Sequence, residues 1–343
     1  MKKLNVLLGM LLLSISAISM AEPVVIKFSH VVAPDTPKGK AAEKFKQMVE
    51  ERSKGAMKVE IYPNSQLYKD REELEALQLG AVQILAPSMA KFGPLGAREF
   101  ELFDLPFIFP NKETLYRTMD GEVGKRLFNK LETKGITGLA YWDNGFKQMS
   151  ANKTMHKVAD FSGLKMRIQS SKVLDAQMKA LGAMPQVMAF SEVYTALQQG
   201  VVDGTENPMS NMYTQKMHEV QKHLTLSDHG YLGYAVITNK KFWDGLTEDQ
   251  RKLLAQAMKE ATVYERGIAQ QENDDSLAKV RAAKSTDIYT LTEAERAEWM
   301  KVLVPVHKEF EGVIGKENIQ EVYDIAAQVA KENAAPKNKT AKK

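Results

Sequence analysis

Six polar side chains lie within, at or just beyond strand-like segments, near the places where open α/β sheets bind their ligands. They are His30, Ser88, Lys91, Lys147, Arg167 and Asn207. The set contains three cations, an imidazole, an amide and a hydroxyl, and no carboxylate accompanies them as an evident partner. Such a set favours an anion as the bound ligand.

Arg167 is the most informative of the six because it lies in the apolar segment 164–168, between Met166 and Ile168. A guanidinium in such a strand needs a partner. Its planar donors match a carboxylate in a bidentate way that lysine cannot reproduce. Spacing alone leaves two partners open, a carboxylate of the ligand or an internal Asp or Glu.

The other candidates also have a structural interpretation when each is taken alone. Asn207 precedes Pro208 and therefore also suits a turn. Lys91 and Lys147 also suit a solvated surface, and Phe190, at another strand end, suits a core as well as the wall of a ligand site.

The usual signatures of enzymes are missing from the chain. It contains no glycine-rich dinucleotide or phosphate loop, no G-x-S-x-G and no H-E-x-x-H. The absence of cysteine excludes disulfides, thiolate nucleophiles and iron–sulfur clusters. His218 and His223 are five residues apart, a poor spacing for a shared metal. The sequence therefore predicts a protein that is not an enzyme and holds no metal or cofactor.

The elements that must position these residues alternate between strand and helix. Strands are expected at 24–29, 58–62 and 82–86, with helices at 37–53 and 70–79 between them. Thr36 suits the N-cap of the first helix, with Pro37 at its first position. This β-α-β-α-β order predicts a parallel sheet with helices on its faces.

A second alternating block follows, after helices near 112–118 and 121–133 and a strand at 136–142. Its expected strands are 164–168, 184–188 and one that begins at Val201, with helices at 171–181 and from Ser191 to Gly200. Asp143-Asn144-Gly145 is interpreted as a turn between the blocks, and 234–238 as a late strand that returns to the first sheet.

The segment from Thr247 to about Lys284 contains no proline and one glycine. Its 38 or so residues, as helix, would span about 57 Å at 1.5 Å per residue. That length favours a brace across two domains, and the sequence predicts a two-domain α/β fold with a hinged cleft and a long bracing helix.

The two ends of the chain are distinct from the rest. Residues 1–21 combine Lys2 and Lys3, an apolar stretch and a small-residue end, which is typical of a secretory signal peptide. Residues 334–343 form a Lys-rich tail that we expect to be disordered. Removing the six lysines of these ends from the 47 basic residues leaves 41 against 43 acidic residues. A nucleic-acid partner is therefore not expected, and a periplasmic location is.

Several stretches together resemble the substrate-binding proteins of tripartite ATP-independent periplasmic (TRAP) transporters, most closely the dicarboxylate-binding branch. They cover about residues 26–243: Phe28-Ser29-His30-Val31, Asn64-Ser65-Gln66-Leu67 with Asp70-Arg71, Asp104-Leu105-Pro106-Phe107, Gly163-Leu164-Lys165-Met166-Arg167, Met188 to Tyr194 with Ala196-Leu197-Gln198, and Val202-Asp203-Gly204 to Asn207-Pro208.

The resemblance implies a monomeric binder of organic anions whose two domains close around the ligand. It implies that Arg167 pairs with a ligand carboxylate and that Asn207 helps to hold the same group. Sialic-acid members have a second arginine where this chain has Lys147, which weakens a sialic-acid assignment and suits a smaller carboxylate. Lys91 and His30 occupy positions where the family places a cation and a polar group, and they are expected to receive the distal carboxylate of a short diacid.

The resulting hypothesis is a periplasmic binding protein that delivers a four-carbon dicarboxylate (malate, succinate or fumarate) to TRAP permease subunits. Another organic acid, a binding protein of an ATP-driven importer and a periplasmic enzyme are the alternatives. The expected division is a signal peptide at 1–21, domain I at 22–144 plus 233–272, and domain II at 145–232 plus 273–333.

Overall fold

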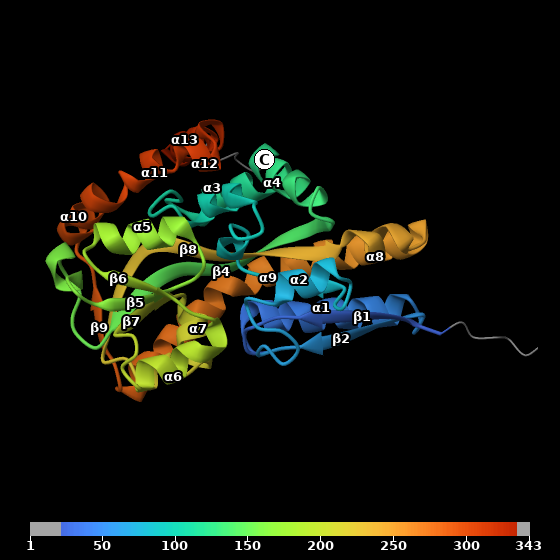
Figure 1. Ribbon diagram of the computed structural model, residues 1–343, viewed down its shortest axis with the longest axis horizontal. Coiled ribbons are helices and arrows are strands. Elements are labelled where there is room, and N and C mark those ends of the chain that lie inside the picture. The colour runs from blue at the N-terminus through green and yellow to red at the C-terminus, as the bar shows by residue number, and fades with distance from the viewer. Residues whose placement is uncertain (1–21, 335–343) are drawn as a thin grey trace, which may run out of the picture.

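The computed structural model describes residues 22–334 and is shown as a ribbon in Figure 1. The predicted signal peptide and residues 335–343 of the Lys-rich tail lie outside this range; Ala334 ends the last helix. Among the described residues, none of the helices has both the length and the apolar character that a membrane crossing requires.

Domain I begins with three parallel strands. Strand β1 (Val24–Ser29) lies between β2 (Met57–Tyr62) and β3 (Ile84–Leu85), and helices α1 (Pro37–Arg52) and α2 (Glu73–Gln78) connect them. The parallel order confirms the prediction. Thr36 caps α1 as predicted, because its side chain accepts a hydrogen bond from the Gly39 amide. Helices α3 (Lys112–Asp120) and α4 (Glu122–Glu132) complete this part.

Two long antiparallel strands join the domains. Strands β4 (Ile136–Ala151) and β8 (His223–Asn239) pair along most of their length, and the sheet order is β2-β1-β3-β8-β4-β7-β5-β6. The predicted turn at Asp143-Asn144-Gly145 is wrong, because these residues lie inside β4. The pairing with β8 shifts register between Asp143 and Gly145, and Gly145 adopts a φ of 131° there. The turn signal thus marks a bulge in a continuous strand.

Domain II carries the other short strands on the far side of β4. Strand β7 (Gly204–Asn207) pairs antiparallel with β4, and β5 (Lys165–Ile168) lies parallel between β7 and β6 (Met184–Val187). Helices α5 (Lys172–Ala180), α6 (Val193–Gln198) and α7 (Met209–Thr214) lie around them (Figure 1). Two local predictions are wrong: β7 starts three residues after Val201, and Ser191 lies inside a 3₁₀ turn that precedes α6 and does not cap it.

Helix α9 (Glu248–Ala283) is a single helix of 36 residues that follows the short α8 (Lys240–Gly245) and crosses behind both domains in Figure 1. Thr247 and Gln250 form a reciprocal capping box at its start. Its Asn273 side chain donates to the Asn144 carbonyl at 2.6 Å, so the helix is tied to the bulge in β4. The predicted brace is confirmed.

The chain ends in a set of helices after β9 (Asp287–Thr290), which pairs with β8: α10 (Glu293–Leu303), α11 (Val306–Glu309), α12 (Glu311–Ile314) and α13 (Lys316–Ala334). Ile319 and Val322 of α13 join the core that contains α3 and α4 residues, and Arg126 of α4 bonds Asn318. The expected division placed α13 in domain II, whereas its apolar face packs on domain I elements.

Candidate ligand-binding site

A small cavity, here the inner cavity, lies where the two domains meet. Four of the seven predicted site residues line it, together with Val31, Tyr234 and others: Ser88, Lys91, Phe190 and Asn207. Its empty space, including the opening to solvent, is about 260 Å³. The part of it that the centre of a water-sized sphere can reach is only about 10 Å³, so the surrounding side chains nearly close this space in the structure.

A second, more open space, the outer cavity, adjoins the first. Its empty volume with the solvent opening is about 920 Å³, and Lys91 and Gln169 line both cavities. Arg167 and Asp70 line only the outer cavity, beside apolar side chains such as Leu95. Five of the seven predicted residues therefore line one or both of these cavities, and His30 and Lys147 line neither.

Arg167 lies on β5 and is 3% exposed. The guanidinium donates two hydrogen bonds to the Met188 carbonyl, from Nε at 3.0 Å and from Nη2 at 2.8 Å. It also lies 5.8 Å from the ring centroid of Phe190. No carboxylate of residues 22–334 forms an ion pair with it, and burial lowers the pKa of Arg167. Asp70, Glu206 and Glu192 act on it only as nearby charges, so the guanidinium is a buried cation at a cavity without a direct ion-pair partner among the described residues.

Lys91 differs from the sequence expectation because it has partners of its own. Its ammonium pairs with Asp70 and with Glu73, the latter at 2.6 Å, and Glu73 is 1% exposed. Burial tends to lower the pKa of Lys91, but these two carboxylates outweigh burial and raise it. The cation at the cavity is therefore charged and already paired with two carboxylates.

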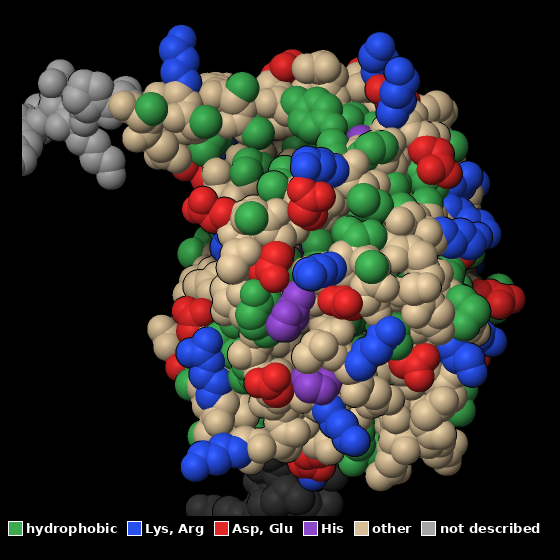
Figure 2. All heavy atoms as spheres, turned by 90° about the vertical axis from the view of Figure 1, so that its left-hand side faces the viewer, with side chains coloured by type: hydrophobic (Ala, Val, Ile, Leu, Met, Phe, Trp, Pro, Cys, Tyr) green, Lys and Arg blue, Asp and Glu red, His purple; other side chains and the backbone are tan. Residues whose placement is uncertain are grey.

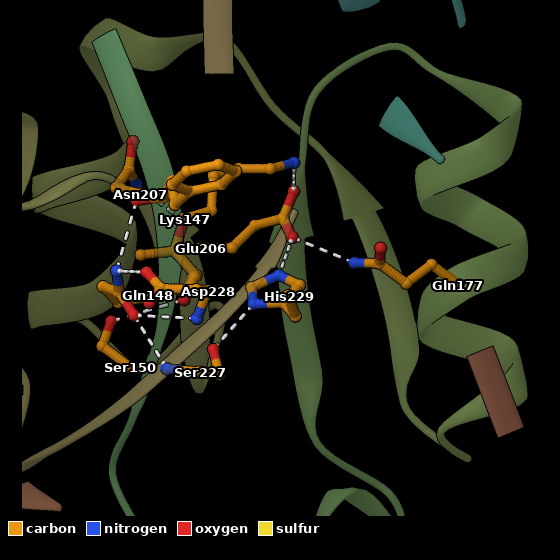
Figure 3. Close-up of polar contacts among 11 residues, drawn as sticks. Lys147, Gln148, Ser150, Gln177, Glu206, Asn207, Ser227, Asp228 and His229 are labelled. Atoms are coloured by element: carbon orange, nitrogen blue, oxygen red, sulfur yellow. Dashed lines mark hydrogen bonds and ion pairs between the residues drawn. The ribbon is translucent and has the colours of Figure 1, made fainter. Parts of the chain in front are cut away.

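Lys147 also has an internal partner, which Figure 3 shows. Its ammonium lies 2.5 Å from Glu206, and the other carboxylate oxygen of Glu206 contacts His229 at 2.8 Å and Gln177 at 3.0 Å. Burial would raise the pKa of Glu206, but Lys147 and His229 hold it well below its usual range. Glu206 precedes Asn207 in β7, so this network fixes the strand that carries Asn207 to the inner cavity.

His30 lies at the end of β1 and is 1% exposed. Neither ring nitrogen has a hydrogen-bond partner among the described residues. Burial, with a contribution from the charge of Lys38, lowers its pKa to about 3, so the ring is neutral at pH 7. His30 does not line the inner cavity, although the next two residues, Val31 and Val32, do.

Ser88 and Gln169 connect the two domains directly. The Gln169 amide, after β5 in domain II, donates to the Ser88 hydroxyl of domain I at 2.8 Å. Ser88 also forms an isolated bridge with Tyr234 of β8. The structure thus has its domains in contact around the predicted residues.

Lys38 is a residue that sequence reasoning missed. It lies in the first turn of α1, fully buried, and its ammonium donates to the Ala86 carbonyl at 2.9 Å. The same ammonium lies 3.6 Å from the ring centroid of Tyr234, which lines the inner cavity. Burial and the nearby Lys91 lower the pKa of Lys38 to about 7. Lysine in an amphipathic helix usually indicates a solvated face, so the sequence carried no signal for its burial.

The described residues contain no group of three or more His, Asp or Glu side chains arranged to hold a metal ion. On the domain II face shown in Figure 2, basic and acidic side chains are interspersed. The side chains that line the two cavities include cations, amides, an aromatic ring and the carboxylates of Asp70 and Glu75.

A family model for bacterial extracellular solute-binding proteins, family 7, matches residues 28–312. The chain belongs to this family. It is a family of solute-binding transport proteins and not of enzymes.

A relative compared by sequence and a relative of solved structure both match this family 7 protein over most of its length. The C4-dicarboxylate-binding periplasmic protein DctP of Rhodobacter capsulatus is 64% identical over 316 residues, which cover 92% of this chain and 95% of that protein. A TRAP periplasmic solute-binding protein of Shewanella oneidensis, solved with bound succinate, has a TM-score of 0.87 and 44% identity, with 88% and 99% of the two chains covered.

A third relative is a TRAP periplasmic solute-binding protein of Pseudomonas aeruginosa, solved with bound L-malate. It has a TM-score of 0.82 and 42% identity, and the match covers 84% of this chain and all of that one. The resemblance to TRAP binding proteins and their dicarboxylate-binding branch, drawn from the sequence motifs, is confirmed by these matches, as is the two-domain fold.

Proposed function

We propose that this protein captures a four-carbon dicarboxylate such as succinate, malate or fumarate in the periplasm and delivers it to the permease subunits of a TRAP transporter. The observation that carries the proposal is Arg167, a buried guanidinium at a cavity between the domains with no carboxylate partner among residues 22–334. The ligands named for the related binding proteins support the choice of acid.

One carboxylate of the ligand binds the guanidinium of Arg167. The guanidinium uses Nε and Nη2 for the Met188 carbonyl, so Nη1 and the second N–H of Nη2 remain for the ligand. Asn207 supports the same carboxylate from β7, and Phe190 forms the apolar wall beside it.

The other carboxylate lies on the domain I side of the inner cavity. Lys91 lies there with its charge paired to Asp70 and Glu73, and Ser88 supplies a hydroxyl. His30 adjoins this side through Val31 and Val32, and its neutral ring has one N–H without a partner among the described residues. Lys38 adds positive potential through its contact with the Tyr234 ring.

Lys147 takes part indirectly. The sequence hypothesis gave it a ligand carboxylate as partner, but its ammonium is engaged by Glu206 at 2.5 Å. We therefore assign Lys147 to the support of β7 and of Asn207, and not to a contact with the ligand.

Calorimetry on the mature protein tests the proposal. Succinate, malate and fumarate are expected to bind with one site per chain, and each should raise the melting temperature through mass action. The monocarboxylate butyrate, of equal carbon number, and sialic acid are the comparison ligands, and both are expected to bind far more weakly. Binding of sialic acid with no response to any four-carbon diacid would overturn the proposal.

Uptake and cell fractionation test the transport role. Deletion of the gene should abolish high-affinity uptake of the diacid by intact cells, and the protein should be recovered in the periplasmic fraction. Uptake that is unchanged in the deletion strain, with neighbouring genes that encode an ATPase, would favour an ATP-driven importer instead.

A further inference from the structure

Asp70 is placed between the two domains without lining the inner cavity. It lies in the turn between β2 and α2, in domain I, and its side chain is 12% exposed. It lines the outer cavity beside Arg167 and Lys91.

The two oxygens of the Asp70 carboxylate contact different domains. Oδ1 forms an ion pair with Lys91 of domain I, and Oδ2 accepts a hydrogen bond from the backbone N–H of Phe190 in domain II. Lys91 is held in turn by Glu73 at 2.6 Å. The carboxylate is therefore fixed on its own domain before it reaches across to the other.

The charge of Asp70 strengthens the bond between domains. Burial alone would raise the pKa of Asp70, but Lys91 and the Phe190 amide outweigh burial and lower the pKa to about 2. The group is thus ionised at neutral pH, and hydrogen bonds that a charged acceptor forms are roughly twice as strong as neutral ones.

A neighbouring ion pair between the same segments provides a natural contrast. Lys69 and Glu192 also reach across the domains, but their charged atoms are 3.6 Å apart and the side chains are 54% and 48% exposed. Exposed ion pairs of this kind contribute about 1 kcal/mol or less to stability. Asp70, with its shorter and buried contacts, is therefore the stronger of the two connections between the domains.

We propose that Asp70 is a positioning residue that latches the closed protein and sets the rate at which the bound acid leaves. This inference deepens the proposed function and rests on it. Because both oxygens of Asp70 are engaged by the protein and its charge repels a carboxylate, Asp70 acts on domain closure and not through contact with the ligand. Its effect is therefore the same for every acid that the site holds.

The chain has no cysteine, so two introduced cysteines provide unique labelling sites. Glu43 of α1 and Gln198 of α6 are exposed and lie on different domains, and Glu43→Cys with Gln198→Cys carries a fluorescent donor and acceptor. Energy transfer then reports domain closure, and stopped-flow mixing gives association and dissociation rates for succinate, malate and fumarate.

In this labelled protein, Asp70→Ala is expected to speed dissociation about 10- to 100-fold, the loss that corresponds to one hydrogen bond with a charged group. Association rates should stay within about 3-fold, and the factor should be the same for all three acids. Asp70→Asn, which keeps an acceptor for Phe190 but loses the charge, should lie between. The control Glu192→Gln should change dissociation by less than about 3-fold, because its ion pair is exposed.

The outcomes separate this inference from the proposed function. If the unaltered protein binds none of the three acids, the proposed function fails and the latch fails with it as stated. If it binds them and Asp70→Ala leaves dissociation unchanged, only the latch is overturned. A factor that differs strongly between succinate, malate and fumarate would show a direct ligand contact and would also overturn the latch.

Discussion

The surroundings of Arg167 and Lys147 differ in one decisive respect. Both are cations buried in domain II, on strands β5 and β4 that flank β7. Lys147 is neutralised by Glu206, which His229 and Gln177 also bond. Arg167 has only a carbonyl oxygen as its hydrogen-bond partner among the described residues. The charge of Lys147 is therefore paired within the protein, whereas the charge of Arg167 has no ion-pair partner among the described residues.

This difference shows why burial alone is a poor guide to a ligand contact. A buried charge is costly unless it is paired, and both side chains satisfy the sequence criterion of a cation at a strand. Only the absence of an ion-pair partner among the described residues distinguishes Arg167, which we expect to bind the ligand, from Lys147, which we expect to stabilise β7. Loss of Lys147 should therefore reduce stability, whereas loss of Arg167 should reduce binding.

The largest effect is expected from Lys147→Met. The substitution leaves the Glu206 carboxylate buried without its ammonium partner, and breaking a buried pair in this way costs about 3–5 kcal/mol. The free energy of unfolding, measured by urea titration in the absence of ligand, should fall by that amount.

The exposed pair of Lys130 and Glu99 provides the control, since its side chains are 61% and 23% exposed and its charged atoms lie 3.0 Å apart. Lys130→Met should cost about 1 kcal/mol or less. If Lys147→Met retained full stability and lost succinate affinity, Lys147 would be a ligand contact and the contrast with Arg167 would disappear.

Arg167→Ala should produce the second largest effect, on binding. Truncation of one partner of a buried charge pair costs about 2–5 kcal/mol, so the dissociation constant for succinate should rise about 30-fold or more. Calorimetry measures it, and urea titration of the same variant should show a smaller loss of stability than Lys147→Met.

Arg281 is exposed on α9 and serves as the matched arginine. Arg281→Ala is expected to bind succinate like the unaltered protein. An Arg167→Ala variant with unchanged affinity would mean that the ligand carboxylate is held elsewhere.

The sequence predicted the cations but not their partners. The apolar neighbours of Arg167 revealed its strand, and the motifs around it revealed the family. Glu206 and Asp70 pair with Lys147 and Lys91 over separations of 59 and 21 residues, which no local pattern encodes. The turn predicted at Asp143-Asn144-Gly145 failed for the same reason, since its pairing with the distant β8 overrides the local turn signal.

Asp104, a buried acidic residue whose pKa the charge of Lys147 affects, makes the stability of the protein depend on pH. It is 3% exposed, its Oδ2 has no hydrogen-bond partner among the described residues, and burial raises its pKa to about 7 despite the charge of Lys147. The folded protein then holds a proton that the unfolded chain, with an ordinary pKa near 3.8, has lost by pH 5. Stability from this group is present at low pH and declines as the pH rises through about 7.

Asp104→Asn removes this titration. Relative to the variant, the unaltered protein should lose about 2–3 kcal/mol of unfolding free energy between pH 5 and pH 8, at 1.36 kcal/mol for each unit of pKa shift. Urea titrations at both values give the difference, with the exposed Asp275→Asn as control. A difference that does not change with pH would mean that Asp104 is ionised and shares the Lys147 charge with Glu206.

Asn207 lies where the two regions meet, and the smallest effect is expected there. Its amide contacts inside the protein are long, 3.3 Å to Thr205 and 3.5 Å from Asn211, so little internal bonding is lost in Asn207→Ala. A hydrogen bond to a ligand carboxylate contributes about 1.5 kcal/mol or somewhat more, which corresponds to roughly 10-fold weaker succinate binding by calorimetry. Asn129→Ala on the exposed face of α4 should leave affinity unchanged. If Asn207→Ala instead lowered stability by several kcal/mol at unchanged affinity, Asn207 would belong to the Glu206 network, and Arg167 would be the only one of the pair that contacts the ligand.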